Sequence, residues 1–210
     1  MRILVIDNEG KLLLGIDKSY VVEVAHSGVD GAYQSQDSDY DAIVVGAMLT
    51  DIDGIEVCRM TRELHVLTPI LLISDVDKVI ALNSGADICE KPNIKPEELH
   101  AQLRALIRRS KGFDPSSEIR VGDVAINQIT RKVYQGKSEI FLRRREYDTL
   151  EYLFLNRGRI LSKENILEHV WEKGLYVTSN SLEVHVKNIR NRLGANVIRT
   201  VHGFGYTVDA

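Results

Sequence analysis

Short apolar runs without polar alternation recur through the first half of the chain, at residues 2–6, 21–25, 42–45, 70–74 and 87–89. Each run is followed by a segment with helical periodicity, at residues 11–18, 28–36, 54–64, 77–84 and 96–109. Parallel strands that are covered by helices on both faces have this pattern. It predicts an α/β domain with a doubly wound, five-stranded parallel sheet in residues 1–110.

A second pattern begins after residues 111–117, a short predicted linker that contains Gly, Asp, Pro and two Ser. Strand-like segments follow at residues 119–126, 132–135 and 138–142. Helices are then predicted at residues 145–156, 162–171 and 180–193, and a glycine-containing hairpin at residues 198–208. Three helices and a hairpin are typical of an α+β winged helix-turn-helix domain, here at residues 118–210.

Helical stripes predict the core of this second domain. Tyr147, Leu150, Leu153 and Phe154 form one stripe, and Leu182, Val186, Ile189 and Leu193 form another. Trp171 and Val184 are also expected in the core. Ser162 is an expected N-cap, with Glu164 in the first turn of its helix.

Charge separates the two domains. The net charge is −3, but from Ser116 onward 15 Lys/Arg stand against 11 Asp/Glu, so this part carries +4 and the rest −7. An acidic part joined to a basic one favours a regulatory domain carried by a nucleic-acid-binding domain.

The sequence lacks several motifs that would indicate a disulfide, a metal site, secretion or catalysis. Cys58 and Cys89 have neither CxxC spacing nor a nearby His cluster, so we expect reduced core thiols rather than a disulfide or a metal site. The start, MRILVID, predicts no signal peptide, and we expect no membrane span and a cytoplasmic protein. No cofactor is expected, and no catalytic motif supports an enzyme.

Three segments of the second domain carry a specific motif: LRRREYDTLEYLFLNRGRILSKENILEHVW, SLEVHVKNIRNRL and IRTVHGFGYTV. With them, residues 119–208 resemble the effector domain of the OmpR/PhoB family. The resemblance implies a transcription regulator that binds double-stranded DNA. Its recognition helix, residues 180–193, would enter the major groove, while the hairpin touches an adjacent minor groove or backbone.

The resemblance also implies which residues face DNA: Asn180, Ser181, His185, Lys187, Asn188, Arg190 and Arg192 on the helix, and Thr200, His202 and Tyr206 on the hairpin. Lys187 is an expected phosphate contact. Asn188 stands where relatives often carry a base-reading arginine, and an asparagine would prefer adenine. His202 replaces an arginine that some relatives insert into the minor groove, so this contact would be weaker or sensitive to pH.

Structural roles remain as alternatives for some of these residues. Arg190 is equally consistent with a solvated or ion-paired surface arginine, and His185 and Tyr206 with packing roles. The run 143–145, three arginines, is more typical of a solvated or interdomain face than of a DNA contact. Residues 172–179 resemble the loop through which such proteins touch RNA polymerase, which is a further expected partner.

The segment DAIVVGAMLTDIDG resembles the phosphorylation site of a response-regulator receiver. Phosphoryl transfer there needs a carboxylate nucleophile, Mg²⁺ held with an acidic pair, a hydroxyl and a lysine. Family spacing places the nucleophile at Gly46, which has no side chain to phosphorylate. The other positions become Asp7-Asn8 with Glu9 behind, Ser74 and Lys91, and the aromatic switch position becomes Cys89.

We therefore expect an atypical receiver that works without phosphorylation. Asp7 and Lys91 are expected to form an ion pair across the pocket, in preference to a Mg²⁺ site. Asp51 and Asp53 lie in the loop beyond the strand, so we do not expect them to replace the missing acceptor.

The dimer face of the family is expected to persist in altered form. It is made by the helix at residues 77–84, the last strand and the helix at residues 96–109. Asp87, Glu98 and Arg109 suit such a face, whereas Gln102 stands where an arginine is usual. We expect a homodimer that is held by more apolar packing.

The leading hypothesis is a sequence-specific, DNA-binding transcription regulator of the two-component type, acting as a homodimer without aspartyl phosphorylation. One alternative is a ligand-responsive regulator that binds a small molecule around Asp7, Gly46, Ser74 and Lys91. Another is a protein-interaction module whose receiver docks another regulator or RNA polymerase.

Overall fold

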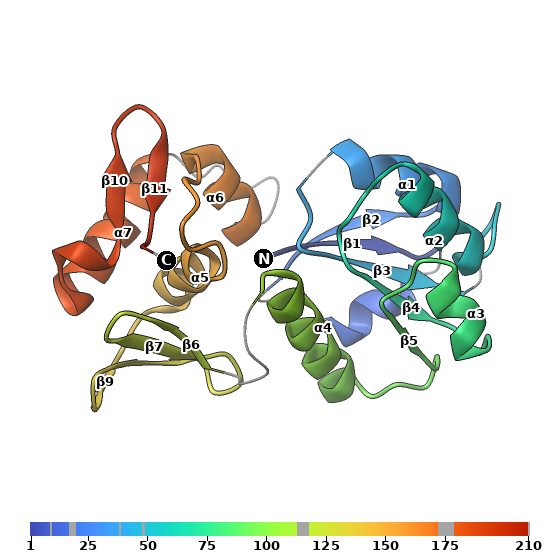
Figure 1. Cartoon of the computed structure of the whole chain (residues 1–210), viewed down its shortest axis with the longest axis horizontal. Coiled ribbons are helices and arrows are strands. Elements are labelled where there is room, and N and C mark those ends of the chain that lie inside the picture. Colours follow the sequence, from blue (N-terminus) through green and yellow to red (C-terminus); the bar gives the residue numbers. More distant parts are fainter. Residues whose placement is uncertain are drawn as a thin grey trace. The chain divides into compact units, whose positions relative to one another are not determined.

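A computed structural model describes residues 1–8, 10–16, 20–37, 39–47, 49–112, 118–171 and 179–209 of the chain. The chain divides into two compact units, Met1–Ser110 and Lys111–Ala210 (Figure 1). Within the described residues, no helix is both long and apolar enough to cross a bilayer. Of the predicted linker, residues 113–117 lie outside the described part.

The first unit is built on a parallel sheet with the strand order β2-β1-β3-β4-β5. Its strands are β1 (Arg2–Ile6), β2 (Val21–Ala25), β3 (Ala42–Gly46), β4 (Ile70–Ile73) and β5 (Ile88–Glu90). Every residue of β1, β3 and β4 is buried. This burial explains why these strands lack polar alternation, and the predicted five-stranded parallel sheet is confirmed.

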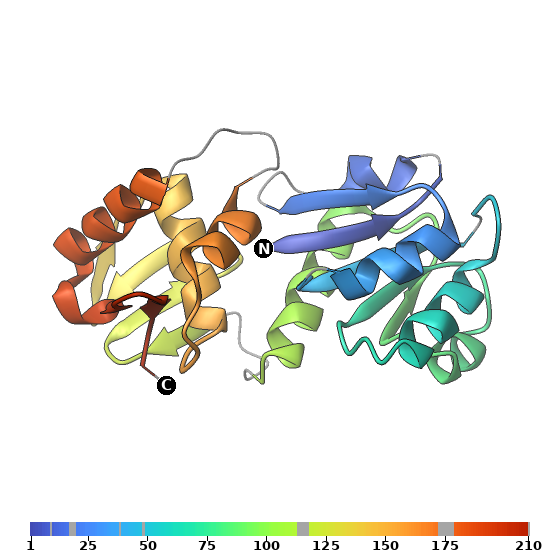
Figure 2. The ribbon, with the colours of Figure 1, turned by 90° about the horizontal axis from the view of Figure 1, so that it is seen from above.

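Helices cover this sheet, and the sheets of both units are seen with their helices in Figure 2. They are η1 (Lys11–Gly15), a 3-10 helix, and α1 (Gly28–Asp37), α2 (Gly54–Glu63), α3 (Lys78–Asn83) and α4 (Pro96–Ser110). Val57 and Cys58 of α2 and Ala81 of α3 share one core cluster with β-strand side chains such as Ile6 and Val45. The helices α4 and η1 pack against each other. Both cysteines are buried free thiols, as expected, and burial raises the pKa of Cys58 to about 12.

The first predicted helix, residues 11–18, is wrong in type and length. The structure has only the short 3-10 helix η1 there, and residues 17–19 lie outside the described part. Gly10 precedes η1 in the left-handed conformation, with a φ of 67°. At Gly15 a Cβ would lie 3.1 Å from the Cδ2 atom of Leu99 in α4. Glycine at both ends weakens a helix, and at Gly15 it permits the close approach to α4.

The loop between β3 and α2 is anchored to the start of α1 by Asp51. Its Oδ1 accepts a hydrogen bond from the N–H of Gly28 at 2.7 Å. Its Oδ2 accepts from the N–H of Val29 and the hydroxyl of Ser27, both at 2.9 Å. The backbone donors of Val29 and Gly28 hold the pKa of Asp51 well below its usual range. Asp51 therefore supplies the negative charge that a helix N-terminus favours.

We predict that Asp51→Asn lowers the melting temperature of the protein most strongly near neutral pH. The ionised carboxylate stabilises the fold above its unfolded-state pKa, and this contribution is lost as the pH falls through the depressed folded-state pKa. The difference from wild type should therefore shrink below about pH 4. Circular-dichroism melts between pH 7 and pH 2 measure it. Asp30→Asn, in the first turn of α1, is the control. If the difference in melting temperature between Asp51→Asn and wild type does not change with pH, the ionised Asp51 carboxylate does not stabilise the fold in this way.

The second unit contains a four-stranded antiparallel sheet and a separate hairpin. The sheet is formed by β6 (Glu118–Val121), β7 (Val124–Asn127), β8 (Lys132–Gln135) and β9 (Ser138–Ile140), and the hairpin by β10 (Arg199–Val201) and β11 (Gly205–Thr207). The strand predicted at residues 119–126 is wrong as a single element. Gly122 has a φ of 58°, which L side chains rarely adopt, so the chain reverses there and makes two strands.

Three α-helices complete this unit: α5 (Arg144–Leu155), α6 (Lys163–Val170) and α7 (Ser179–Leu193), followed by the 3-10 helix η2 (Ala195–Val197). The winged helix-turn-helix prediction is confirmed, as are both predicted core stripes, whose side chains are all buried. Ser162 caps α6 by accepting a hydrogen bond from the N–H of Asn165 at 3.0 Å. The assignment of Val184 to the core is wrong, because its side chain is 55% exposed. A residue two positions from Leu182 and Val186 lies on the opposite face of the helix.

Candidate nucleic-acid interface

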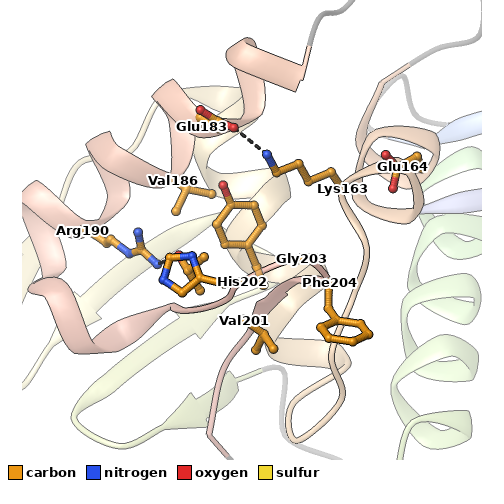
Figure 3. A pocket seen from close by; sticks show the side chains of 12 residues that line it. Lys163, Glu164, Glu183, Val186, Arg190, Val201, His202, Gly203 and Phe204 are labelled. Carbon is orange, nitrogen blue, oxygen red and sulfur yellow. Dashed lines mark hydrogen bonds and ion pairs between the residues drawn. The ribbon is translucent and has the colours of Figure 1, made fainter.

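A groove of about 580 Å³ lies between α7 and the β10–β11 hairpin. We call residues 199–207 the wing and this hollow the α7–wing groove. It is lined by Lys163 and Glu164 of α6, by Glu183, Val186 and Arg190 of α7, and by residues 200–206 of the wing (Figure 3). The groove therefore joins the predicted recognition helix to the predicted wing.

Glycine backbone geometry sets the shape of the wing. Gly203 at its turn has a φ of 80°, and Gly205 has a φ of 146°. The N–H of Leu161 donates a hydrogen bond to the carbonyl oxygen of Tyr206 at 2.8 Å, and the N–H of Tyr206 donates one to the carbonyl oxygen of Leu161 at 2.9 Å. Because these backbones lie so close, a Cβ on Gly205 would lie 2.0 Å from the carbonyl oxygen of Leu161. His202 and Phe204 are exposed at the turn, where Figure 3 shows them pointing apart. The wing thus presents two aromatic rings to solvent.

Arg190 fastens the wing to α7. Its guanidinium donates two hydrogen bonds to the carbonyl oxygen of Ile198, at 2.9 and 2.7 Å, and one to the hydroxyl of Thr200, at 2.7 Å. It also lies 5.9 Å from the ring centroid of Tyr206. Tyr206 is buried, and burial raises the pKa of its hydroxyl. Of the two roles left open for Arg190 and Tyr206, these contacts support the structural one.

One face of α7 is exposed to solvent. The exposed residues recur at helical spacing: Asn180, Glu183, Val184, Lys187 and Asn191. Asn180 and Lys187 belong to the set expected to face DNA, as does the exposed Arg192. Glu183, Val184 and Asn191 were not in that set. The periodicity opposite the buried stripe of α7 could have identified them.

Two of the residues expected to face DNA point into the domain instead. His185 is half-buried against Trp171, with ring centroids 5.6 Å apart, and burial lowers its pKa, which favours the neutral imidazole. The side-chain amide of Asn188 donates to Oε1 of the buried Glu146 at 3.0 Å. Glu146 also accepts from the N–H of Arg143 at the start of α5, at 2.8 Å. Asn188 therefore helps to hold α7 on α5, and His185 packs α7 against Trp171 at the end of α6.

Arg144, Arg145 and Arg192 also have partners within the domain. Arg145 donates to the carbonyl oxygen of Val170 and lies 3.8 Å from Asp148. Arg144 lies 4.0 Å from the same carboxylate. Arg192 donates to the carbonyl oxygen of Phe141. The contacts of Arg144 and Arg145 favour a structural role for these two residues over a DNA contact.

Gly46 ends β3 in the first unit, at the carboxyl edge of the sheet. A Cβ placed on Gly46 would lie 3.6 Å from both Oδ1 of Asp7 and Cδ1 of Leu12. Asp7 is buried, and its Oδ2 accepts a hydrogen bond from the N–H of Leu12 at 2.9 Å. Leu12 of η1 thus brings both a methyl group and a backbone donor to the corner where the family spacing leads us to expect the nucleophile position.

The expected ion pair between Asp7 and Lys91 is wrong. Both residues belong to the described part of the chain, and no ion pair joins them: Asp7 is buried against η1, whereas Lys91 is exposed after β5. An ammonium group loses less hydration free energy at the surface, and the Leu12 N–H already serves the carboxylate. Ser74 also has a local partner, since its hydroxyl accepts from the N–H of Val76 at 3.2 Å.

The residues at this corner do not fit the Mg²⁺ ion of a receiver. Gly46 offers no ligand, and Asn8 offers an amide where the family has a carboxylate. Glu9 lies outside the described residues. Within the described part, no three His, Cys, Asp or Glu side chains are grouped to hold a metal ion. Asp51 caps α1, and Asp53 caps α2 by accepting from the N–H of Glu56 at 2.8 Å, so each of the two nearby carboxylates has a structural role.

The face made by α3, β5 and α4 is apolar on α3. Val79 is 65% exposed, and Ile80 and Leu82 are each 50% exposed. The polar residues expected on this face have partners in their own unit: Asp87 accepts from Arg62 at 2.8 Å, and Gln102 donates to Glu90 at 3.3 Å. Glu98 and Arg109 are exposed.

Comparison with known proteins accounts for both units. The family described as response regulator receiver domain matches residues 3–104, and the family described as transcriptional regulatory protein, C terminal, matches residues 136–208. The response regulator MprA of Mycobacterium avium is 35% identical over 99% of this chain and 98% of its own length. The chain belongs to the OmpR/PhoB family of response regulators. MprA of Mycobacterium tuberculosis is also 35% identical, over 99% of this chain and 97% of its own.

This OmpR/PhoB-family chain is a DNA-binding transcription regulator of the two-component type. Among solved structures, it is similar to DrrB, an OmpR/PhoB homolog of Thermotoga maritima. The identity is 23% and the TM-score 0.46, with 100% of this chain and 99% of DrrB covered.

We predict that Gly205→Ala destabilises the wing and weakens DNA binding. The new methyl group would overlap the carbonyl oxygen of Leu161, and overpacking and backbone strain of this kind cost roughly 1–3 kcal/mol. Thermal melts and gel-shift titrations measure both effects. Gly203→Ala is the control, since it also has a positive φ but no atom within 4 Å of its Cβ. Equal losses in the two variants would contradict the role of the Leu161 contact.

Proposed function

We propose that this protein regulates transcription as a homodimer and does so without aspartyl phosphorylation. The observation that carries the proposal is Gly46 at the end of β3, with Leu12 and Asp7 packed around the position of its missing side chain. A phosphoryl group cannot be transferred to a residue without a nucleophile, and the remaining groups do not fit Mg²⁺. The same packing disfavours the alternative of a small molecule bound around Asp7, Gly46, Ser74 and Lys91.

The homodimer is proposed on the apolar surface of α3. Three large aliphatic side chains at least half exposed on one short helix leave an apolar surface that association could cover. Asp87 and Gln102 already have partners, so apolar packing rather than new ion pairs would supply most of the affinity. The exposed Glu98 and Arg109 would lie at the rim of the interface.

DNA recognition is proposed on the exposed face of α7 and on the wing. Lys187 and Arg192 would contact phosphates, and the amides of Asn180 and Asn191 suit adenine. Val184 suits the methyl group of thymine. Ser181, His185, Asn188, Arg190, Thr200 and Tyr206 remain in the proposed site, mainly as residues that position α7 and the wing, and His202 as a wing contact. The proposed contact with RNA polymerase falls on residues 172–179, of which 172–178 lie outside the described part.

We predict that phosphodonor treatment leaves DNA binding unchanged. Purified protein is used to select genomic fragments, and the best fragment is titrated by gel shift with and without a small-molecule phosphodonor. A two-half-site fragment should bind with the same affinity in both conditions, and intact-mass spectra should show no phosphoryl adduct. Binding that requires the phosphodonor would mean that another side chain accepts the phosphoryl group.

We predict that Val79→Glu weakens the dimer by about tenfold or more, because a charge in an apolar interface loses its hydration without a partner. Size-exclusion chromatography with light scattering, over a range of protein concentrations, measures the dissociation constant. Leu67→Glu is the matched control, since Leu67 is 90% exposed and lies between α2 and β4. A wild-type protein that stays monomeric throughout, or equal effects of both variants, would refute the proposed interface.

A further inference from the structure

Lys163 and Glu183 form an ion pair across one end of the α7–wing groove. The Nζ atom of Lys163 lies 2.5 Å from Oε1 of Glu183, and Figure 3 shows the pair spanning α6 and α7. The two side chains are 38% and 50% exposed. The pair therefore stands in contact with water, on the surface that the proposed function assigns to DNA.

The formal charges that line the groove cancel. Lys163 and Arg190 are its cations, leaving aside His202, and Glu164 and Glu183 are its anions. Arg190 already donates its hydrogen bonds to Ile198 and Thr200. Sequence-independent DNA affinity comes from cations that replace the counterions of phosphates. A neutral groove contributes little to it, although its position between helix and wing suits a DNA backbone.

The end of the groove at Lys163 would attract an anion if Glu183 were neutral. Lys163 is the first residue of α6, directly after the N-cap Ser162, and a helix N-terminus carries partial positive charge. Glu183 brings its carboxylate to this point from the exposed face of α7. Exposed ion pairs are weak and are screened by salt, so a phosphate could compete for the ammonium group.

We propose that Glu183 is an internal counter-ion for Lys163, occupying the ammonium group that a DNA phosphate would otherwise take and so lowering the affinity for any DNA sequence. This inference rests on the proposed DNA site of α7 and the wing. It makes Glu183 a residue that sets the sequence-independent part of binding. The affinity that remains then depends more on base contacts from the exposed face of α7.

The test is Glu183→Gln in the full-length protein, titrated against the selected duplex and a random-sequence duplex over a range of salt concentrations. We expect both affinities to rise about three- to tenfold near 0.1 M salt, with a salt dependence steeper by about one unit. In a Lys163→Gln background, Glu183→Gln should change the affinity less than about twofold, because no ammonium group is left to release.

The matched control is Glu139→Gln. Lys132 and Glu139 form a comparable exposed pair at 2.8 Å, with side chains 46% and 51% exposed, between β8 and β9. This substitution changes the net charge equally but outside the groove, so it should leave affinity nearly unchanged. Circular-dichroism melts check that every variant stays folded.

Three results overturn the inference: no effect of Glu183→Gln, an equal effect of Glu139→Gln, or a loss of affinity confined to the selected duplex. The last result would mean that Glu183 reads a base, as a carboxylate can at cytosine. The proposed DNA site fails separately, and the inference with it, if the wild-type protein shows neither a preference for the selected duplex nor a dependence on salt.

Discussion

A polar group that is removed from water is costly unless it finds a hydrogen-bond partner, and this requirement positions several charged side chains in both units. The penalty for an unpaired buried donor or acceptor exceeds the net gain of a typical hydrogen bond. Asp7 meets the requirement with the N–H of Leu12, and Asp51 meets it for the N–H of Gly28 at the start of α1. In the second unit, Arg190 meets it for the carbonyl oxygen of Ile198. Charged side chains that could have bound a ligand instead form hydrogen bonds that stabilise the fold.

The receiver corner shows the consequence most clearly. A cluster of carboxylates repels itself unless a metal ion or a protonated group is present. In this chain, the family spacing puts Gly46 at the expected nucleophile position and Asn8 at one expected acidic position, so fewer carboxylates would meet at this corner. Leu12 then approaches the corner, with its Cδ1 atom 3.6 Å from where a Gly46 Cβ would stand. Leu12 of η1 thus packs at the corner where Asp7 and Gly46 meet.

The DNA-binding unit divides its charged side chains between structure and surface. Arg190 donates to the carbonyl oxygen of Ile198, just before the wing, and Arg145 to that of Val170 in α6. Lys187 remains exposed on the outer face of α7. Lys163 combines both situations: it is in contact with water, but it is also ion-paired with Glu183 at the edge of the groove. A winged helix can therefore carry many basic residues and still present a moderate positive field to DNA.

The sequence by itself determined the five parallel strands, the helical stripes around Tyr147 and Leu182, and the motif of the wing. These features depend on local periodicity and on the conformational freedom of glycine, which neighbouring residues reveal. Only the tertiary structure decided that Asn188 bonds to Glu146, 42 residues away in the chain, and that Asp7 pairs with a backbone N–H rather than with Lys91. Such partners depend on which segments the fold brings within hydrogen-bond distance, and a side chain's type does not specify its partner. Val184 is an intermediate case: the period of α7 already places it opposite Leu182, but its apolar side chain alone favoured the core.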